Sequence, residues 1–221
     1  GTSRDPDEII GRMSPTNTGG YFEYWTFTVR DVAVNAVMAG CKPEYLPIVL
    51  AAVEGACTDQ FNIHGLLCTL WFSGPVVIVN GPIRNEIGMN SGKNALGQGN
   101  RPNSTIGRAL QLVIRNVGGG KPGGIDRATQ GNPSKYGLCF AEDEEGSPWQ
   151  PLSVDLGLAS GVSSVTLFPG EGPRSIVDQL SRDPEAAAAA KGIRLDPVEA
   201  RLLKSTSPEQ LARMAERLVI P

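Results

Sequence analysis

A nucleophile or redox centre is the first chemistry that this sequence offers, at Cys41. The residue lies in the segment GCKPEYLP, next to Lys42 and directly before a predicted helix. A helix N-terminus and a neighbouring cation both favour a thiolate, which is the reactive form of cysteine. We therefore predict Cys41 as a catalytic residue. The alternative is a small buried side chain that fills a turn.

Proton transfer is the second chemistry, and its candidates are His64 and Glu54. His64 is the only histidine, and imidazole is the side chain whose unperturbed pKa lies near neutrality. Glu54 interrupts the apolar segment LPIVLAAVEGAC, where a carboxylate must face solvent, find a partner or be protonated. We predict both as catalytic residues. The alternatives are a structural histidine with one hydrogen bond and an exposed glutamate at a helix edge.

A long loop rich in glycine and asparagine spans residues 88–103, GMNSGKNALGQGNRPN. It is not a Walker A motif, because three residues instead of four separate Gly88 from Gly92-Lys93. Glycines let backbone N–H groups approach a ligand, and the helix predicted to begin at Ser104 attracts anions. The loop therefore predicts a carboxylate or phosphate site, with an Ω-loop that caps its own turns as the alternative. Together with the polar Asn35 of VAVNAVMAG, the predicted ligand-binding residues are Asn35, Asn90, Lys93, Asn94, Asn100 and Arg101.

Metal binding has two candidate ligands, His64 and Glu142. A single histidine excludes a metal cage built from several histidines of this chain. Glu142 opens an acidic run, 142–145, directly after a predicted strand. Such a run is usually a solvated face, but a carboxylate at a strand end also suits a base or a ligand for a hard cation. The cofactor is thus left open, with a metal ion as one possibility.

Helices and strands must position these candidate residues, and the spacing of hydrophobic residues predicts both kinds of element. We expect an α/β or α+β fold, with one globular domain over residues 1–175 whose mixed sheet is flanked by helices, and a C-terminal helical extension over 176–221. The expected helices cover 5–13, 31–39, 43–57, about 104–117 and a segment that begins at Ser207, and the expected strands cover 21–29, 66–72, 76–80, 135–141 and 163–168.

The composition of the chain argues against nucleic acid and membranes as partners. The 221 residues carry 20 Lys and Arg against 23 Asp and Glu, without the basic stripe of a nucleic-acid binder. Hydrophobic residues make up 40% of the chain, and no apolar run reaches the roughly 20 residues of a membrane span. The four cysteines form no CxxC pair. We expect a cytoplasmic protein that binds neither nucleic acid nor membrane.

Four segments of the chain resemble a bacterial family: 34–54, 61–65, 77–119 and 133–152. Members of that family are encoded beside, or fused to, a small domain with the motif X-Gly-Ser-Cys, in which X is selenocysteine or cysteine. That family carries a thiol–disulfide oxidoreductase-like description. Since the motif is missing here, the resemblance implies that this chain is the partner of a small thiol or selenol protein.

Residues and resemblance together predict a subunit of a heteromeric enzyme that acts on a small polar or carboxylated substrate through thiol or redox-linked chemistry. Two alternatives stay open. One is a lyase or hydratase-type enzyme whose metal site is completed by the partner, and the other is a scaffold subunit without catalysis.

Overall fold

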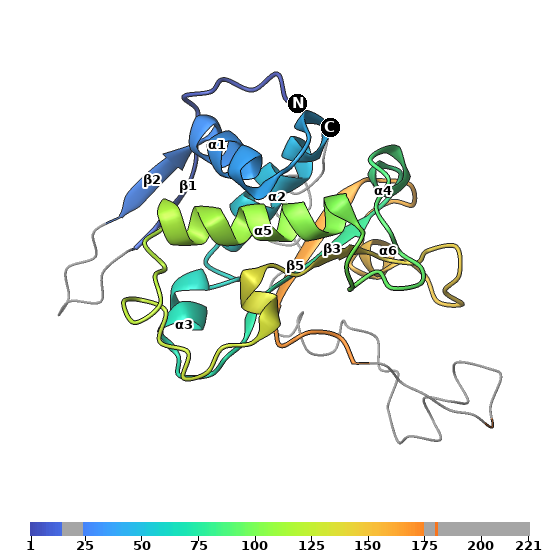
Figure 1. Cartoon of the computed structure of the whole chain (residues 1–221). Helices are drawn as coiled ribbons and strands as arrows, with labels where there is room; N and C mark the ends of the chain where they lie inside the picture. The colour runs from blue at the N-terminus through green and yellow to red at the C-terminus, as the bar shows by residue number, and fades with distance from the viewer. Residues whose placement is uncertain (15–23, 175–179, 181–221) are drawn as a thin grey trace.

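A mixed three-stranded sheet forms the centre of the molecule, with the strand order β4-β3-β5. The computed structural model describes residues 1–14, 24–174 and 180 (Figure 1). Strand β3 (Gly74–Asn80) pairs in parallel with β4 (Cys139–Ala141) and antiparallel with β5 (Ser164–Gly170). Helices flank this sheet, which confirms the predicted mixed α/β fold.

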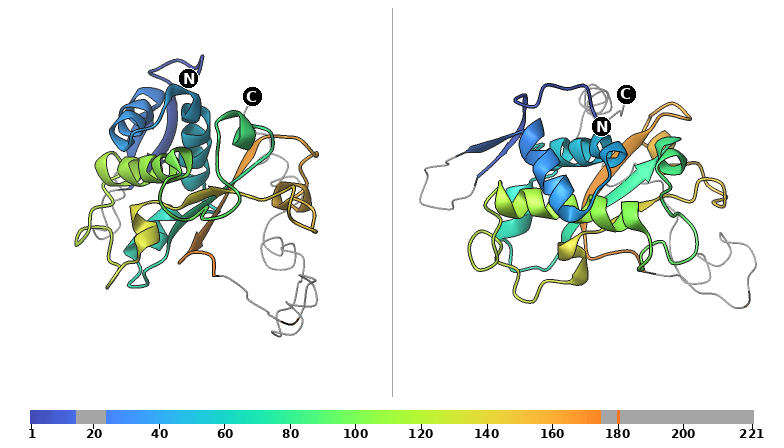
Figure 2. Two further views of the ribbon diagram at one scale, coloured as in Figure 1. Left: turned by 45° about the vertical axis from the view of Figure 1, so that its right-hand side comes forward. Right: turned by 45° about the horizontal axis from the view of Figure 1, so that its top comes forward.

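Helices α2 (Leu46–Ala56) and α5 (Arg101–Asn116) cover one face of the sheet, and α1 (Val29–Ala39) packs on these two helices (Figure 2). Helix α2 is buried along most of its length, and α5 buries an apolar stripe that is typical of an amphipathic helix. The core between helices and sheet includes Ile48, Val49, Val53, Val77, Val79, Ile106, Leu110 and Val113.

The predicted helices over 31–39 and 43–57 are confirmed. Helix α1 has a capping box between Thr28 and Asp31, and it ends at Gly40, whose left-handed conformation (φ 90°) suits glycine. The predicted helix 43–57 consists of a 3₁₀ turn, Pro43–Tyr45, followed by α2.

The predicted helix over 5–13 is wrong. Residues Ile9–Met13 form strand β1, which pairs antiparallel with β2 (Trp25–Thr28), inside the predicted strand 21–29. Asp5 caps a tight turn, because its carboxylate accepts a hydrogen bond from the Asp7 N–H at 2.9 Å. Pairing with a distant strand thus outweighs the local helical pattern.

The predicted strand over 66–72 is also wrong, because helix α3 (Ile63–Cys68) occupies this region. Asn62 adopts the left-handed conformation, and its side chain accepts a hydrogen bond from the Gly65 N–H at 3.1 Å. This cap satisfies a backbone donor that a short helix would otherwise leave free.

The other elements agree with prediction in part. Strands β3 and β5 are confirmed at 76–80 and 163–168, whereas only the end of the predicted strand 135–141 is extended, after a 3₁₀ turn at Pro133–Tyr136. Helix α5 begins at Arg101 instead of Ser104. The unpredicted short helices are α4 (Ile83–Glu86) and α6 (Leu152–Asp155).

The structure does not describe most of the residues after 174, so the predictions for the C-terminal extension are not tested. The helix predicted from Ser207 lies outside the described residues, so the division at residue 175 stays a prediction. Within the described ranges, the helices are too short or too polar for a membrane crossing. All four cysteines are free thiols.

Helix α5 approaches the backbone before β4 very closely, and Gly107 makes this possible. A Cβ at Gly107 would lie 2.8 Å from the Leu138 backbone nitrogen and 3.1 Å from that of Cys139. Only a residue without a side chain fits at such a distance from another backbone. Gly107 therefore sets the spacing between the helical layer and the sheet.

We predict that Gly107→Ala lowers the free energy of unfolding by about 1–3 kcal/mol, because α5 or the β4 backbone must shift. Urea unfolding measures this change. Ser104→Ala, on the exposed side of the same helix, is the control and should change stability by no more than about 0.5 kcal/mol. A gain of about 1 kcal/mol, as expected for Gly→Ala in an unconstrained helix, would show that the close approach imposes no constraint.

Candidate functional site

A thiol and an imidazole meet on helix α3. His64 and Cys68 are four residues apart and therefore lie on the same face of the helix. The His64 Nε2 atom is 3.4 Å from the Cys68 Sγ atom. On the other side of the ring, Nδ1 lies 3.3 Å from the carbonyl oxygen of Ser14.

This geometry assigns a role to each ring nitrogen. A carbonyl oxygen only accepts hydrogen bonds, so Nδ1 carries the proton and donates to Ser14. In the neutral ring, Nε2 then accepts from the Cys68 S–H. The arrangement has the order of a nucleophile, a base and a group that orients the base.

Cys68 is half-buried, and both its burial and a neighbouring charge affect the pKa of its thiol. Burial raises the pKa of Cys68, and the positive charge of Arg127 opposes this increase in part. The thiol thus carries its proton at neutral pH. Reaction of such a thiol requires a base beside it, and His64 occupies that position.

Sequence reasoning missed Cys68, although it selected His64. The spacing of four residues has meaning only on a helix, and the apolar run after His64 favoured a strand. The signal that identifies the pair is Asn62, whose residue type is preferred at the position before a helix.

The structure places Cys41 at a different location. Cys41 follows the end of α1 beside the first turn of α5, where Arg101 Nε donates to the Gly40 carbonyl at 3.1 Å. Helix α3 instead lies near the other end of α5, where Leu67 packs against Gly120 (Figure 1). The 16 residues of α5 correspond to about 24 Å of helix.

The expectation that the Cys41 thiolate is favoured is wrong in direction. Burial raises the pKa of Cys41, and a hydrogen bond with Thr105 and the charge of Arg101 offset this only in part. Lys42 lies 3.7 Å from the Glu44 carboxylate, which reduces its effect on the thiol. A catalytic role of Cys41 stays a prediction.

Glu54 finds an ionic partner. Its Oε1 atom lies 2.7 Å from Arg4 Nη1, and its side chain is 23% exposed. Arg4 also binds Glu8 at 2.7 Å, so Glu54 belongs to an ion-pair cluster that holds the N-terminal segment against α2.

Asn35 is buried and connects two helices. Its Nδ2 donates to the Asp31 carbonyl at 2.9 Å, and its Oδ1 accepts from Asn116 Nδ2 at 2.8 Å. Asn116 is on α5, so the polar residue in α1 satisfies its hydrogen bonds within the protein. These contacts support the structural interpretation over ligand binding.

The loop of residues 88–100 uses its asparagines to hold its own backbone. Asn90 Nδ2 donates to the Lys93 carbonyl and to Asn100 Oδ1, each at 2.9 Å. Asn100 Nδ2 donates to the Asn94 carbonyl at 2.8 Å. Asn103, which sequence reasoning did not select, exchanges hydrogen bonds with the Asn90 backbone at 3.1 and 2.8 Å.

These contacts favour the Ω-loop interpretation, because side-chain amides that close the loop are already occupied. Asn94 donates to the Gln98 carbonyl at 3.3 Å, and Lys93 is exposed. Anion binding by the loop stays a prediction without support from these side-chain contacts.

Glu142 lies at the end of β4, and its carboxylate is held in place. Its Oε2 atom accepts from Asn80 Nδ2 at 2.6 Å and from the Leu152 N–H at 2.9 Å. Asn80 Nδ2 also donates to Glu144 at 2.9 Å. His64, the other predicted metal ligand, is hydrogen-bonded to Ser14 and Cys68. These hydrogen bonds and those of Glu142 do not bring the two predicted ligands together. Across the described ranges, no group of three or more His, Cys, Asp and Glu side chains is placed to hold a metal ion.

A buried guanidinium organises the acidic run. The Arg84 side chain is 3% exposed and forms ion pairs with Glu144 at 3.0 Å and Glu145 at 2.9 Å. Its Nη1 donates to the Glu142 carbonyl at 2.7 Å. The run 142–145 is therefore not a simple solvated face, because Arg84 attaches it to α4 and Asn80 attaches it to β3.

Comparison with known proteins finds no matching family model, no matching curated protein and no matching solved structure.

We predict that Glu145→Gln reduces thermal stability at pH 7 and that its difference from the wild type shrinks as pH falls below 4.5. The hydrogen bond from Arg84 lowers the pKa of Glu145 below its ordinary value of 4.5. Stabilisation by an ionised carboxylate is present above the unfolded pKa and is lost as pH falls through the folded one. Melting curves at pH 7 and pH 3 measure this effect.

Glu86→Gln, on the exposed side of α4, is the control and should show no comparable dependence on pH. An equal difference between wild type and Glu145→Gln at both pH values would contradict the assignment of this ion pair.

Proposed function

We propose that this chain is the subunit of a thiol-dependent enzyme, with Cys68 as the nucleophile and His64 as its base. One observation carries the proposal. The Cys68 Sγ atom lies 3.4 Å from His64 Nε2, and Ser14 holds the opposite ring nitrogen at 3.3 Å. This is the constellation that nucleophilic catalysis by cysteine needs.

Thiol–disulfide exchange is the reaction that fits this pair and the sequence resemblance. Cys68 Sγ attacks one sulfur of a disulfide, while His64 Nε2 takes the thiol proton. A sulfur–sulfur bond to Cys68 forms, the original bond between the two sulfurs breaks, and the leaving thiolate takes the proton from His64. A second thiol then attacks the mixed disulfide and returns Cys68 to its thiol form.

Cys57 and Cys139 are less suited to this step. Burial raises the pKa of Cys57 to about 12, and it also raises the pKa of the fully buried Cys139. Exchange requires an accessible sulfur. Cys68 combines partial exposure with an adjacent base.

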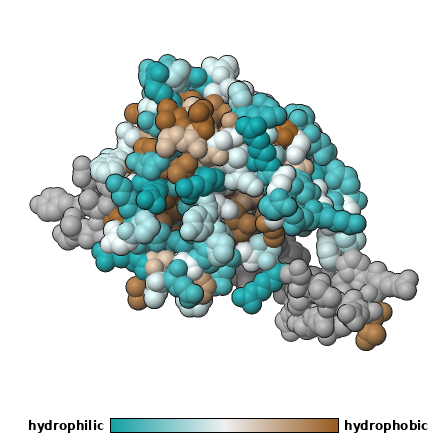
Figure 3. Space-filling view, in the orientation of Figure 1, coloured by the Kyte–Doolittle hydropathy of each residue, from teal (hydrophilic) through white to brown (hydrophobic). Residues whose placement is uncertain are grey.

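A partner protein is part of the proposal, as the resemblance to a bacterial family predicts. Exposed apolar side chains support an assembly: Leu70 and Trp71, which are 71% and 57% exposed, follow Cys68 closely in the chain. Figure 3 shows a further apolar patch over α1, where the exposed residues are Val34, Val37 and Met38. Large exposed apolar surfaces mark interaction sites. The proposed partner is a small thiol or selenol protein, and the proposed compartment is the reducing cytoplasm.

We predict that dithiodipyridine, a small disulfide probe, modifies Cys68 before the other three cysteines. The released thiopyridone gives the rate, and peptide mass spectrometry gives the site. His64→Gln should slow the Cys68 reaction by about a hundredfold, because general-base assistance is lost. Cys68→Ser should remove the fast phase.

Cys41→Ser is the matched control and should leave the fast phase unchanged. If Cys41→Ser removes the fast phase and Cys68→Ser does not, the thiol centre lies at Cys41 and the proposal is wrong. An unchanged rate in a folded His64→Gln variant would exclude His64 as the base.

A further inference from the structure

A hollow of about 630 Å³ lies between the Gly/Asn loop and the end of β4. Its volume is in the range of small-molecule sites. The lining residues come from loop segment 91–97, from residues 140–143 and from Pro173. These contacts place the hollow apart from the Cys68–His64 pair, so it has no part in the proposed function.

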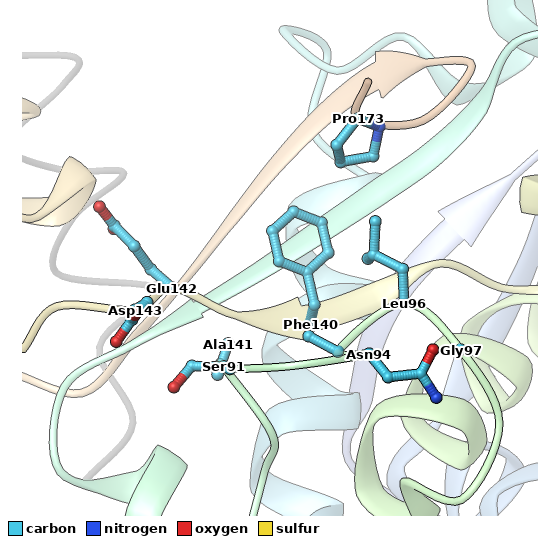
Figure 4. A pocket seen from close by; sticks show the side chains of 11 residues that line it. Ser91, Asn94, Leu96, Gly97, Phe140, Ala141, Glu142, Asp143 and Pro173 are labelled. Carbon is cyan, nitrogen blue, oxygen red and sulfur yellow. The ribbon is translucent and has the colours of Figure 1, made fainter. Parts of the chain in front are cut away.

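One side of this hollow is apolar. Figure 4 shows the side chains of Phe140, Leu96 and Pro173 on the same side of the cavity. Leu96 is 50% exposed although it is a large apolar residue. An aromatic or aliphatic group placed here would cover these side chains and remove apolar surface from water.

The other side is acidic. Glu142 and Asp143 line the hollow and lie away from the apolar side chains in Figure 4. Around them, the run 142–145 brings four carboxylates, and the nearby buried cation is Arg84. Lys93 is exposed between two lining residues but does not itself line the hollow.

Glu142 is positioned before any ligand arrives. Both hydrogen bonds to its carboxylate end on Oε2, from Asn80 Nδ2 at 2.6 Å and the Leu152 N–H at 2.9 Å. These donors fix the carboxylate, and no donor to its Oε1 atom is found in the described part of the chain. A fixed acceptor at the edge of a hollow orients a ligand with little loss of side-chain freedom.

We propose that this hollow binds an organic cation, a primary amine or a guanidinium group attached to a small apolar body. The cation lies against Glu142 and Asp143, and the apolar body lies against Phe140, Leu96 and Pro173. The loop asparagines hold the loop in shape and leave the charge selection to the two carboxylates. The ligand class thus differs from the carboxylated substrate that the sequence predicts.

Three probes with the same phenethyl body and different charge test this proposal: phenethylamine, phenethyl alcohol and hydrocinnamate. Titrations followed by protein NMR at one ionic strength give the dissociation constants. We expect the amine to bind about tenfold more tightly than the alcohol, as for a hydrogen bond between charged groups. We expect hydrocinnamate to bind more weakly than either.

Variants locate the site. Glu142→Gln and Asp143→Asn should each reduce the preference for the amine over the alcohol, and Leu96→Ala should weaken both ligands. Glu86→Gln, on exposed α4, is the control with the same charge change and should have no effect. Asp143 is exposed, so Asp143→Asn tests the site even if Glu142→Gln does not fold.

Binding of hydrocinnamate as tightly as the amine would overturn the proposal. So would the absence of binding by all three probes, or an amine preference that survives both carboxylate substitutions.

Discussion

The close contact between helix α5 and the backbone before β4 is the constraint on which the rest of the structure depends. It exists because residue 107 has no side chain, so that the helix axis lies nearer to the sheet than an ordinary helix would. Helices α1 and α2 then pack around α5 and fill the core. The same helix carries Arg101 at one end and precedes the Gly120 turn that supports α3 at the other. Both regions with candidate chemistry are therefore positioned by one element.

Polar groups within this framework follow one rule, which is that a buried donor or acceptor must find a partner. Asn35 bonds to Asn116, Glu54 pairs with Arg4, and Asn90 bonds to Asn100. Sequence alone identifies such residues as unusual. It does not show whether the partner is a ligand or another residue of the chain, since that depends on contacts between distant segments.

Local signals predicted the helices that end at strong caps, such as the helix that stops at Gly40, and the apolar strands β3 and β5. They failed at 5–13, where the chain pairs with β2, and at 66–72, where α3, capped by Asn62, occupies the first part of the apolar run. Because of the wrong strand over 66–72, the sequence did not identify the pair of His64 and Cys68. His64 was selected for its chemistry, but its nearest nucleophile became visible only once helical geometry placed Cys68 one turn away.

The most direct test of the account is a long-range proton–nitrogen NMR spectrum of the imidazole, because the chain has one histidine and its signals need no further assignment. We expect that neutral His64 carries its proton on Nδ1, and that Cys68→Ser shifts the Nε2 signal whereas Cys41→Ser does not. A proton on Nε2, or an Nε2 signal that is the same in wild type and Cys68→Ser, would contradict the hydrogen bond between Cys68 and His64.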